Sequence, residues 1–494
     1  MNTAYKRIVV VGGGSAGWMA AIALATALPA SSVELVESEE IGIVGVGEAT
    51  FPSIRTFHRL LGIDEARFLR ATNGTYKLGI EFRDWRAAGE HYFHTFGDIG
   101  GLSGSRSLWG QYRRVGDAGL GALGEQCLPS VMAREGRFQL AASEEQQQFS
   151  YAYHFDAMLY ADFLRTLALQ RGVRRTEGRI VHVERGADGS ISQLKLPDGR
   201  VVEGELFVDC SGFASLLLGR TLEEPFVDFG RWLPVDRAWA CPSERSGPEL
   251  APYTRATALE AGWAWRIPLR SRTGHGHVFS SRYIDEERAR EQLMQQLDGA
   301  PVAEPRLLRF ATGHRQRFWV HNVVALGLSS GFLEPLESTS IFLVQSGLGR
   351  LIEVLLAGAR PAPAEVAAYN TGMQRQFERV RDFIILHYCL TARRDSQLWR
   401  DMASMALPET LAFKIHAWRQ SGTLHQYDEE GFDATSWLAI HAGMGHWPER
   451  ADPSLHDISH EDALLALRFR RDSIAATVAA MTTHQDYLQS VLAR

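Results

Sequence analysis

Residues 7–17 read RIVVVGGGSAG, a short β-branched run followed directly by a cluster of glycines. The run has the composition of a buried strand, and residues 18–28 have that of a helix. A second β-rich run, residues 32–36, ends on Glu37. This order predicts a β-α-β unit at the start of the chain.

The glycines of this stretch predict a dinucleotide-binding turn. Gly12, Gly14 and Gly17 have the spacing G-x-G-x-x-G between a strand and a helix, and Glu37 lies 20 positions beyond Gly17. Glycines let the backbone approach a pyrophosphate, the helix N-terminus offers amide donors, and an acid at this distance accepts hydrogen bonds from a ribose. A glycine-rich turn without a ligand is the alternative, and the strand-turn-helix context favours the dinucleotide.

Composition sets the broad class. The chain has 494 residues, 45% hydrophobic and 22% charged, with a net charge of −6, which indicates an ordinary globular protein without the basic stripe of a nucleic-acid-binding protein. The four cysteines are far apart and form neither a disulfide framework nor a zinc-binding spacing. No stretch approaches the roughly 18 apolar residues of a membrane span. We expect a soluble, cytoplasmic monomer or homodimer with no metal, membrane or nucleic-acid partner.

The segment FVDCSG, residues 207–212, resembles the second strand-turn signature of FAD-dependent monooxygenases. It favours FAD over NAD as the dinucleotide, with an ordinary strand and Ser-Gly turn as the alternative. Further short strands are expected at residues 179–183, 191–196 and 205–208.

The predicted fold class is α/β, with a Rossmann-type FAD-binding domain of the flavin monooxygenase type. This domain is expected to occupy residues 1–345 and to contain an antiparallel sheet layer at about residues 230–320. Apolar residues at helical spacing in 346–356, 363–389 and 474–492 predict a mostly helical C-terminal subdomain, 346–494, that completes the substrate pocket.

Residues 262–268, GWAWRIP, match the W-x-W-x-I-P signature of flavin-dependent halogenases, best known from the tryptophan halogenases. Residues 74–80, GTYKLGI, and 334–340, EPLESTS, match two further segments of that family. Together with the glycine turn and residues 207–212, five segments of the chain match the pattern of this family. The chain resembles the flavin-dependent halogenase family.

The resemblance implies that Lys77 and Glu337 are catalytic, and that Trp263 and Trp265 keep the substrate away from the flavin. Alternating residues of a strand that pack as core would also explain the tryptophans. Without the resemblance, Lys77 would be taken for a surface lysine and Glu337 for an acid at a helix start.

The implied chemistry is the oxidation of halide by reduced FAD and oxygen to hypohalous acid, which then reacts with an electron-rich aromatic ring. Lys77, as an ammonium, hydrogen-bonds hypohalous acid; deprotonated, it forms a haloamine, and the sequence leaves both mechanisms open. Glu337 orients the electrophile or accepts the proton that the ring loses.

The amides of Thr339 and Ser340, at an expected helix start, form the candidate halide site. Tryptophan halogenases usually have glycine at the position of Ser340, so the preference for chloride or bromide stays open. Residues 45–50, GVGEAT, resemble the family's flavin-covering strap. The implied cofactor-binding residues are Gly12, Gly14, Ser15, Ala16, Gly17, Glu37, Gly47, Glu48, Ala49 and Leu328.

Candidate substrate residues are the aromatic side chains of His94, Phe96, Phe432 and Trp437, for which a packed core cluster is the alternative. Tryptophan halogenases hold the free amino acid with tyrosine, glutamate and asparagine residues of a lid, and residues 424–447 do not match that clamp residue by residue. We therefore expect an indole-type substrate other than free tryptophan.

No second dinucleotide motif is present for NAD(P)H, so reduced flavin is expected from a separate reductase. Two other functions fit the FAD motif alone. One is an aromatic hydroxylase that transfers oxygen directly to its substrate, and the other is a non-catalytic Rossmann-type binding protein. Lys77, Glu337 and the two tryptophans favour the halogenase.

Overall fold

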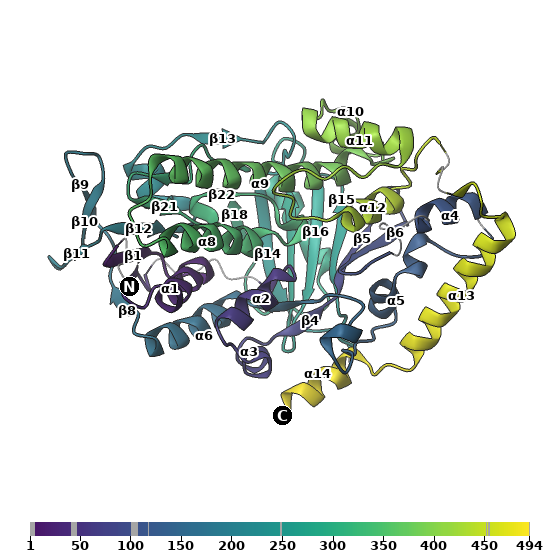
Figure 1. The fold of residues 1–494 in the computed structure, drawn as a ribbon, viewed down its shortest axis with the longest axis horizontal. Helices are drawn as coiled ribbons and strands as arrows, with labels where there is room; N and C mark the ends of the chain where they lie inside the picture. Colours follow the sequence, from purple (N-terminus) through teal and green to yellow (C-terminus); the bar gives the residue numbers. More distant parts are fainter. Residues whose placement is uncertain are drawn as a thin grey trace. The chain divides into compact units, whose positions relative to one another are not determined.

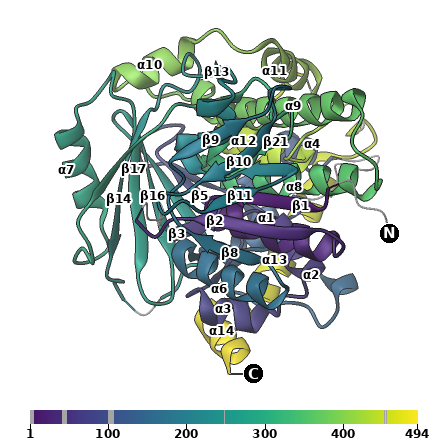
Figure 2. The same cartoon turned by 90° about the vertical axis from the view of Figure 1, so that its left-hand side faces the viewer.

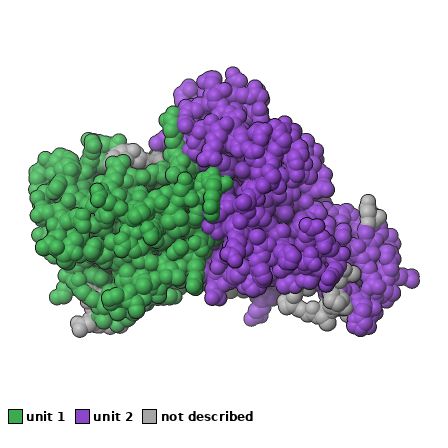
Figure 3. All heavy atoms as spheres, turned by 90° about the horizontal axis from the view of Figure 1, so that it is seen from above, with its two compact units in different colours: residues 1–74, 155–231, 309–378 green, residues 75–154, 232–308, 379–494 purple. Residues whose placement is uncertain are grey.

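The computed structural model describes residues 5–40, 47–99, 107–116, 118–247, 249–450, 452 and 455–493. Two compact units are present, and each is assembled from three segments of the chain (Figure 3). The first unit comprises Met1–Gly74, Phe155–Arg231 and Arg309–Glu378, and the second comprises Thr75–His154, Trp232–Leu308 and Arg379–Arg494.

A six-stranded sheet is the centre of the first unit. Its order is β20-β21-β12-β1-β2-β8, and the neighbouring strands from β21 to β8 are parallel, whereas β20 pairs antiparallel with β21 (Figure 1). The strands are β1 Arg7–Val11, β2 Ser32–Glu37, β8 Arg174–Glu177, β12 Leu206–Asp209, β20 Trp319–Val320 and β21 Val323–Ala325.

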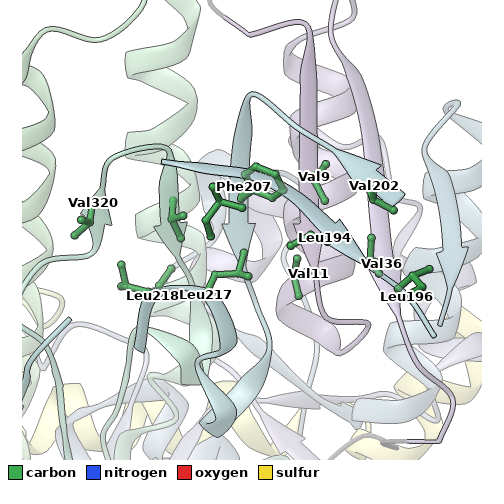
Figure 4. Packing of buried hydrophobic residues seen from close by; sticks show 13 residues of the cluster. Val9, Val11, Val36, Leu194, Leu196, Val202, Phe207, Leu217, Leu218 and Val320 are labelled. Atoms are coloured by element: carbon green, nitrogen blue, oxygen red, sulfur yellow. The ribbon is translucent and has the colours of Figure 1, made fainter. Parts of the chain in front are cut away.

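One face of this sheet is covered by a small antiparallel sheet of β9 His182–Arg185, β10 Ile191–Lys195 and β11 Val201–Glu203. Val9 and Val11 pack in one buried cluster with Leu194 and Val202 of that sheet (Figure 4). Because side chains alternate along a strand, Ile8 and Val10 point to the opposite face. Helix α1, Ser15–Ala27, contacts β1 and β2 and is buried along most of its length.

The other helices of the first unit are α2 Ser53–Leu60, α3 Glu65–Ala71, α6 Ala157–Gln170 and α8 Ser340–Leu356. The third sheet of this unit is also small and has the order β13-β19-β22, with β13 Phe226–Asp228, β19 Gly313–Arg315 and β22 Gly331–Phe332. Helix α9, Pro363–Cys389, supplies its first part to this unit and its last part to the second.

A seven-stranded sheet of order β18-β14-β17-β16-β15-β5-β6 dominates the second unit (Figure 2). Strands β14 to β17 are antiparallel neighbours, and β5 joins β15 in parallel. The strands are β5 Gly79–Arg83, β6 His91–Thr95, β14 Arg237–Ser243, β15 Thr254–Leu259, β16 Gly262–Pro268, β17 Thr273–Phe279 and β18 Arg306–Arg309.

Helices supply much of the rest of the second unit: α4 Leu108–Val115, α5 Leu128–Arg134, α7 Glu286–Gln296, α10 Gln397–Ser404, α11 Glu409–Ser421, α12 Ala434–Gly443, α13 His460–Ala479 and α14 His484–Leu492. The short strand β4, Thr75–Lys77, lies antiparallel to residues 152–154 of β7, Ala152–Asp156.

The α/β fold class, the Rossmann-type sheet, the antiparallel layer and the helical C-terminal part are confirmed. The division expected after residue 345 falls inside α8, which begins at Ser340. The helical pattern of residues 474–492 is divided between α13 and α14, because Thr483 caps the start of α14 by accepting a hydrogen bond from the amide of Asp486. None of the helices in the described chain is long and apolar enough to cross a membrane.

Candidate active site

The glycine turn lies at the carboxyl end of β1, against the carboxyl end of β12. Gly12 has a φ of +113°, and a β-carbon on it would lie 2.2 Å from the carbonyl oxygen of Cys210. A β-carbon on Gly17 would lie 1.8 Å from the carbonyl oxygen of Gly12. Only glycine fits at these two positions, so the tight turn into α1 depends on both.

The N-terminus of α1 has no side-chain cap. Gly14 occupies the N-cap position, no side chain bonds to the first amides, and the first turn contains no acid. In the described part of the chain, seven of the other α-helices have a capping side chain: Asp64 at α3, Ser107 at α4, Asp156 at α6, Asp285 at α7, Asp433 at α12, Ser459 at α13 and Thr483 at α14. An uncapped helix start at the sheet edge suits a pyrophosphate.

Glu37, at the end of β2, lies over the glycine turn. Its Oε2 is 1.4 Å from where a β-carbon of Gly13 would be placed. Arg175 of β8 donates from Nε to Oε1 of Glu37 at 2.6 Å and holds the carboxylate at this edge. The position agrees with the predicted hydrogen bond to a ribose.

The loops after β12 and β21 complete this edge. The Asp209 carboxylate accepts hydrogen bonds from the amides of Leu217 and Leu218 at 2.8 and 2.9 Å. Ser215 Oγ donates to the carbonyl of Ser329 at 2.8 Å, which ties the two loops together. Leu328, a predicted cofactor residue, lies in the loop after β21, in the short helix η5, Gly327–Ser329.

The carboxyl ends of β1, β12 and β21 therefore meet at one edge, where a doubly wound sheet binds a nucleotide. The residues present fit FAD, with a glycine turn and free helix amides for the pyrophosphate and Glu37 for a ribose. Asp209, Ser215 and Ser329 also build this edge and were not among the predicted site residues. The motif of residues 207–212 was the signal for the first of them.

Three of the predicted strap residues, Gly47, Glu48 and Ala49, form the short strand β3, Gly47–Ala49. Gly45 and Val46 lie outside the described residues. Burial, together with the negative charge of Asp156, raises the pKa of Glu48 to about 7. Glu48 is therefore an acid of the predicted strap that titrates near neutrality.

Glu337 ends the short helix η6, Pro335–Glu337, and its side chain is buried. Ser338 follows in the left-handed conformation with a φ of +61°, which a serine rarely adopts, and Thr339 is the N-cap of α8. Thr339 is fully buried, and its Oγ1 has no hydrogen-bond partner among the described residues. A buried hydroxyl at the start of a 17-residue helix is a suitable environment for an anion.

Lys77 is fully buried in the second unit. Its Nζ lies 5.2 Å from the centre of the Phe96 ring, and Phe96 itself is partly exposed. A buried lysine needs hydrogen-bonding or charged partners, so the interpretation of Lys77 as an ordinary surface lysine is excluded.

A hydrogen-bonded chain supports the strand of Lys77. Thr75 Oγ1 donates to the carbonyl of Pro268, the last residue of the W-x-W-x-I-P segment, at 3.0 Å. The buried His154 imidazole lies between Thr75 and Thr254, with 3.0 Å contacts on both ring nitrogens. Burial holds the pKa of His154 well below its usual range, and the Lys77 charge lowers it further. The imidazole is therefore neutral and adds no second cation beside Lys77.

Trp263 and Trp265 are two residues apart on β16, so they share one face of the sheet, and their ring centres are 6.2 Å apart. Both side chains are buried. The Trp265 ring covers Gly276 of β17, where a β-carbon would lie 2.0 Å from ring carbons. Glycine at position 276 thus leaves room for the indole ring of Trp265.

The other candidate substrate residues form an aromatic cluster with Phe383 of α9. Phe432 stacks on Phe383 with ring centres 3.9 Å apart, and Trp437 meets the Phe383 ring edge-on at 5.1 Å. His94 lies 5.6 Å from Phe383. His94, Phe432 and Trp437 are all buried, so they form a packed layer, whereas Phe96 lies apart from it, against Lys77.

The two units thus carry different parts of the predicted site. The first contains the dinucleotide residues together with Glu337, Thr339 and Ser340. The second contains Lys77, the tryptophan pair and the aromatic substrate candidates.

Comparison with known proteins decides the family. A family model described as tryptophan halogenase matches residues 7–460. The chain belongs to the tryptophan halogenase family. It is 37% identical over 486 residues to a tryptophan 6-halogenase from Streptomyces toxytricini, with 92% of each chain covered.

Solved structures of flavin-dependent halogenases agree with this membership. The chain is similar to such an enzyme from Xanthomonas campestris, with 43% identity, a TM-score of 0.95 and 99% of each chain covered. A flavin-dependent halogenase from Brevundimonas sp. BAL3 gives 43% identity, a TM-score of 0.93 and the same coverage. This tryptophan halogenase family member is therefore a flavin-dependent enzyme, an oxidoreductase.

Gly12 and Gly14 provide a matched pair of substitutions that tests the flavin site. Gly12→Ala is expected to destabilise the apoprotein by at least about 2 kcal/mol, because its β-carbon meets the Cys210 carbonyl and its φ is positive. Gly14→Ala has open space around its β-carbon and is expected to stay within about 1 kcal/mol of the wild type. Urea unfolding measures both.

The same Gly14→Ala variant is expected to bind FAD about tenfold more weakly, because the new methyl group stands where a phosphate approaches the helix amides. Titration of flavin fluorescence measures this affinity. Wild-type FAD affinity in Gly14→Ala would show that the dinucleotide does not lie on this turn.

Glu48 predicts a pH dependence of stability. Its folded pKa of about 7 lies above its ordinary value of 4.5, so the folded state binds the proton more tightly than the unfolded state. The stability of the apoprotein should therefore fall as the pH rises from 4.5 to 7, by on the order of 1–3 kcal/mol, with the full cost present above pH 7. Glu48→Gln should lack this contribution to the fall in stability, and at pH 8 it should melt at a higher temperature than the wild type. If the melting temperatures of the wild type and of Glu48→Gln change with pH by the same amount between pH 4.5 and pH 8, the assignment is contradicted.

Proposed function

We propose that this protein halogenates an electron-rich, indole-type aromatic substrate, with reduced FAD, oxygen and chloride or bromide as co-substrates. The balanced reaction converts aromatic C–H, halide, a proton, oxygen and reduced FAD into the carbon–halogen bond, two molecules of water and FAD. FAD supplies the oxidising chemistry that converts halide to hypohalous acid. A separate flavin reductase supplies the reduced flavin.

The observation that carries the proposal is the complete burial of Lys77 in a chain of the tryptophan halogenase family. A buried ammonium with limited access to water donates stronger hydrogen bonds than an exposed one, which suits the binding and activation of hypohalous acid. His154 is neutral and hydrogen-bonded on both sides, so it supports the strand of Lys77 without adding a charge of its own. A haloamine on Lys77 is the alternative form of the same step.

Glu337 is proposed to accept the proton that the ring loses when aromaticity returns. Thr339 and the α8 amides are proposed to hold the halide, since the unpartnered hydroxyl of Thr339 and the positive end of a long helix both favour an anion. Ser340 is the first residue of that helix and contributes an amide to the same end.

Trp263 and Trp265 are proposed to form the barrier between flavin and substrate, with Phe96 as the ring that the substrate meets beside Lys77. His94, Phe432 and Trp437 would then shape the wall behind it. The relatives named as tryptophan halogenases make free tryptophan a substrate to test beside indole. The expectation that free tryptophan is not the natural substrate stays a prediction.

Lys77→Ala is the decisive substitution. The purified protein with FAD, a flavin reductase, NADH, oxygen and sodium bromide should convert indole or tryptophan to a brominated product, detected as an isotope doublet by mass spectrometry. Lys77→Ala should lower this activity at least about a hundredfold, and Glu337→Ala at least about tenfold, because each removes a group that acts on the reacting atoms. Lys195→Ala, at a partly exposed lysine of β10, is the matched control and should retain wild-type activity.

A product that gains oxygen instead of bromine would refute the halogenase and favour the hydroxylase. Bromination that persists in Lys77→Ala would show that free hypobromite, rather than the protein, is responsible for it.

A further inference from the structure

A cluster of buried charged side chains lies in the helical part of the second unit. We define the charge cluster as Arg379, Arg381 and Asp382 of α9, Lys414 of α11 and Glu430 before α12. These side chains are at most 9% exposed. Because burying charge is costly, this many ionic groups in one place requires a specific role or complete pairing.

Pairing is incomplete. Arg381 donates two hydrogen bonds to Oδ1 of Asp382 at 2.9 and 2.7 Å, and Lys414 pairs with Oε1 of Glu430. Arg379 has no carboxylate partner among the described residues. It donates from Nε to the Asp428 carbonyl at 3.4 Å and lies 4.4 Å above the Tyr427 ring.

Two atoms of the charge cluster are left with unused hydrogen-bonding capacity. Arg379 Nη1 and Glu430 Oε2 are buried and have no partner in the described part of the chain. A buried guanidinium N–H without an acceptor destabilises the folded protein, unless a ligand supplies the acceptor. The cluster contains three cations and two carboxylates, so it has a surplus of one positive charge.

The charge cluster adjoins the aromatic cluster. Lys414 Nζ lies 3.7 Å from the centre of the Trp437 ring, and Trp437 packs edge-on against Phe383, which stacks on Phe432. Burial lowers the pKa of Lys414, and the Glu430 carboxylate opposes this shift. The charge cluster therefore borders, through Lys414, the aromatic side chains that we propose as the substrate wall, and Arg379 lies one turn before Phe383 on α9.

We propose that the aromatic substrate carries a carboxylate, and that Arg379 is the specificity-determining residue that binds it. This inference rests on the proposed function and names the chemical class of its substrate. A carboxylate supplies the missing acceptor through charge-assisted hydrogen bonds and balances the surplus charge. A substrate with an ammonium at the same place meets net repulsion.

Lys414 is a positioning residue in this arrangement. Its ion pair neutralises Glu430, so that the glutamate does not repel the substrate carboxylate, and its contact with the Trp437 face holds that ring. The remaining Oε2 of Glu430 suits a neutral N–H of the same ligand.

Two ligands of matched shape test the proposal. Indole-3-propionate and tryptamine place a carboxylate and an ammonium, respectively, at the end of a two-carbon chain on the same ring. Calorimetric titration of the FAD-loaded protein, without reductant, should show indole-3-propionate binding at least about tenfold more tightly than tryptamine. Arg379→Gln should remove most of this preference and leave the affinity for unsubstituted indole within about twofold, since indole makes no use of the guanidinium.

Two further variants separate charge from structure. Arg379→Lys should restore part of the preference, because it keeps the charge but loses the planar donor pair. Arg375→Gln, at an exposed arginine one turn earlier on α9, removes the same charge and should bind all three ligands as the wild type does.

Equal binding of the two ligands by the wild type would overturn the inference even if Arg379→Gln failed to fold. A preference for indole-3-propionate that survives in a folded Arg379→Gln would also overturn the role of Arg379. Because binding is measured without turnover, selective binding without halogenation would refute the proposed function alone. Halogenation without a preference for the acid would refute the inference alone.

Discussion

The close approach of two backbone segments, at Gly12 and at Cys210, is the constraint on which the flavin-binding unit depends. A β-carbon at Gly12 would overlap the Cys210 carbonyl, and one at Gly17 would overlap the carbonyl of Gly12. Without those β-carbons, β1 and β12 can end side by side and α1 can begin immediately above them. The uncapped amides of α1, the Glu37 carboxylate and the Asp209 loop are all positioned by this junction.

The second unit depends on a different kind of support, in which hydrogen-bonded polar side chains hold the strand of the buried Lys77. Thr75 connects the strand of Lys77 to the end of the tryptophan-bearing strand β16, and His154 completes the chain as a neutral imidazole. Such a network is stable only when each buried donor and acceptor is used. Residues 74–80 and 262–268, two of the segments that resemble the halogenase family, are thereby joined by a hydrogen bond.

The division of chemistry between the units follows from the properties of the groups. The α/β unit provides backbone amides and a helix start, which suit the anionic parts of a dinucleotide and a halide. The sheet and helices of the second unit provide indole and phenyl rings with buried cations, which suit an aromatic acid and an electrophilic halogen. Arg379 and Lys414 lie among the rings because cations pack favourably on aromatic faces when a carboxylate balances the remaining charge.

The sequence alone determined the features that depend on local spacing. The strand at residues 7–11, the glycine turn and Glu37 were predicted at their observed places, because the period of a strand and the steric need for glycine are visible in neighbouring residues. The family resemblance, rather than local spacing, selected Lys77, Glu337 and the tryptophan pair as predicted site residues. Only the tertiary structure decided that Lys77 is buried, that Thr75 contacts Pro268 and that Arg379 lacks a carboxylate partner among the described residues. These facts join residues tens to hundreds of positions apart, and burial or pairing over such separations depends on the packing of the whole unit, which no local pattern encodes.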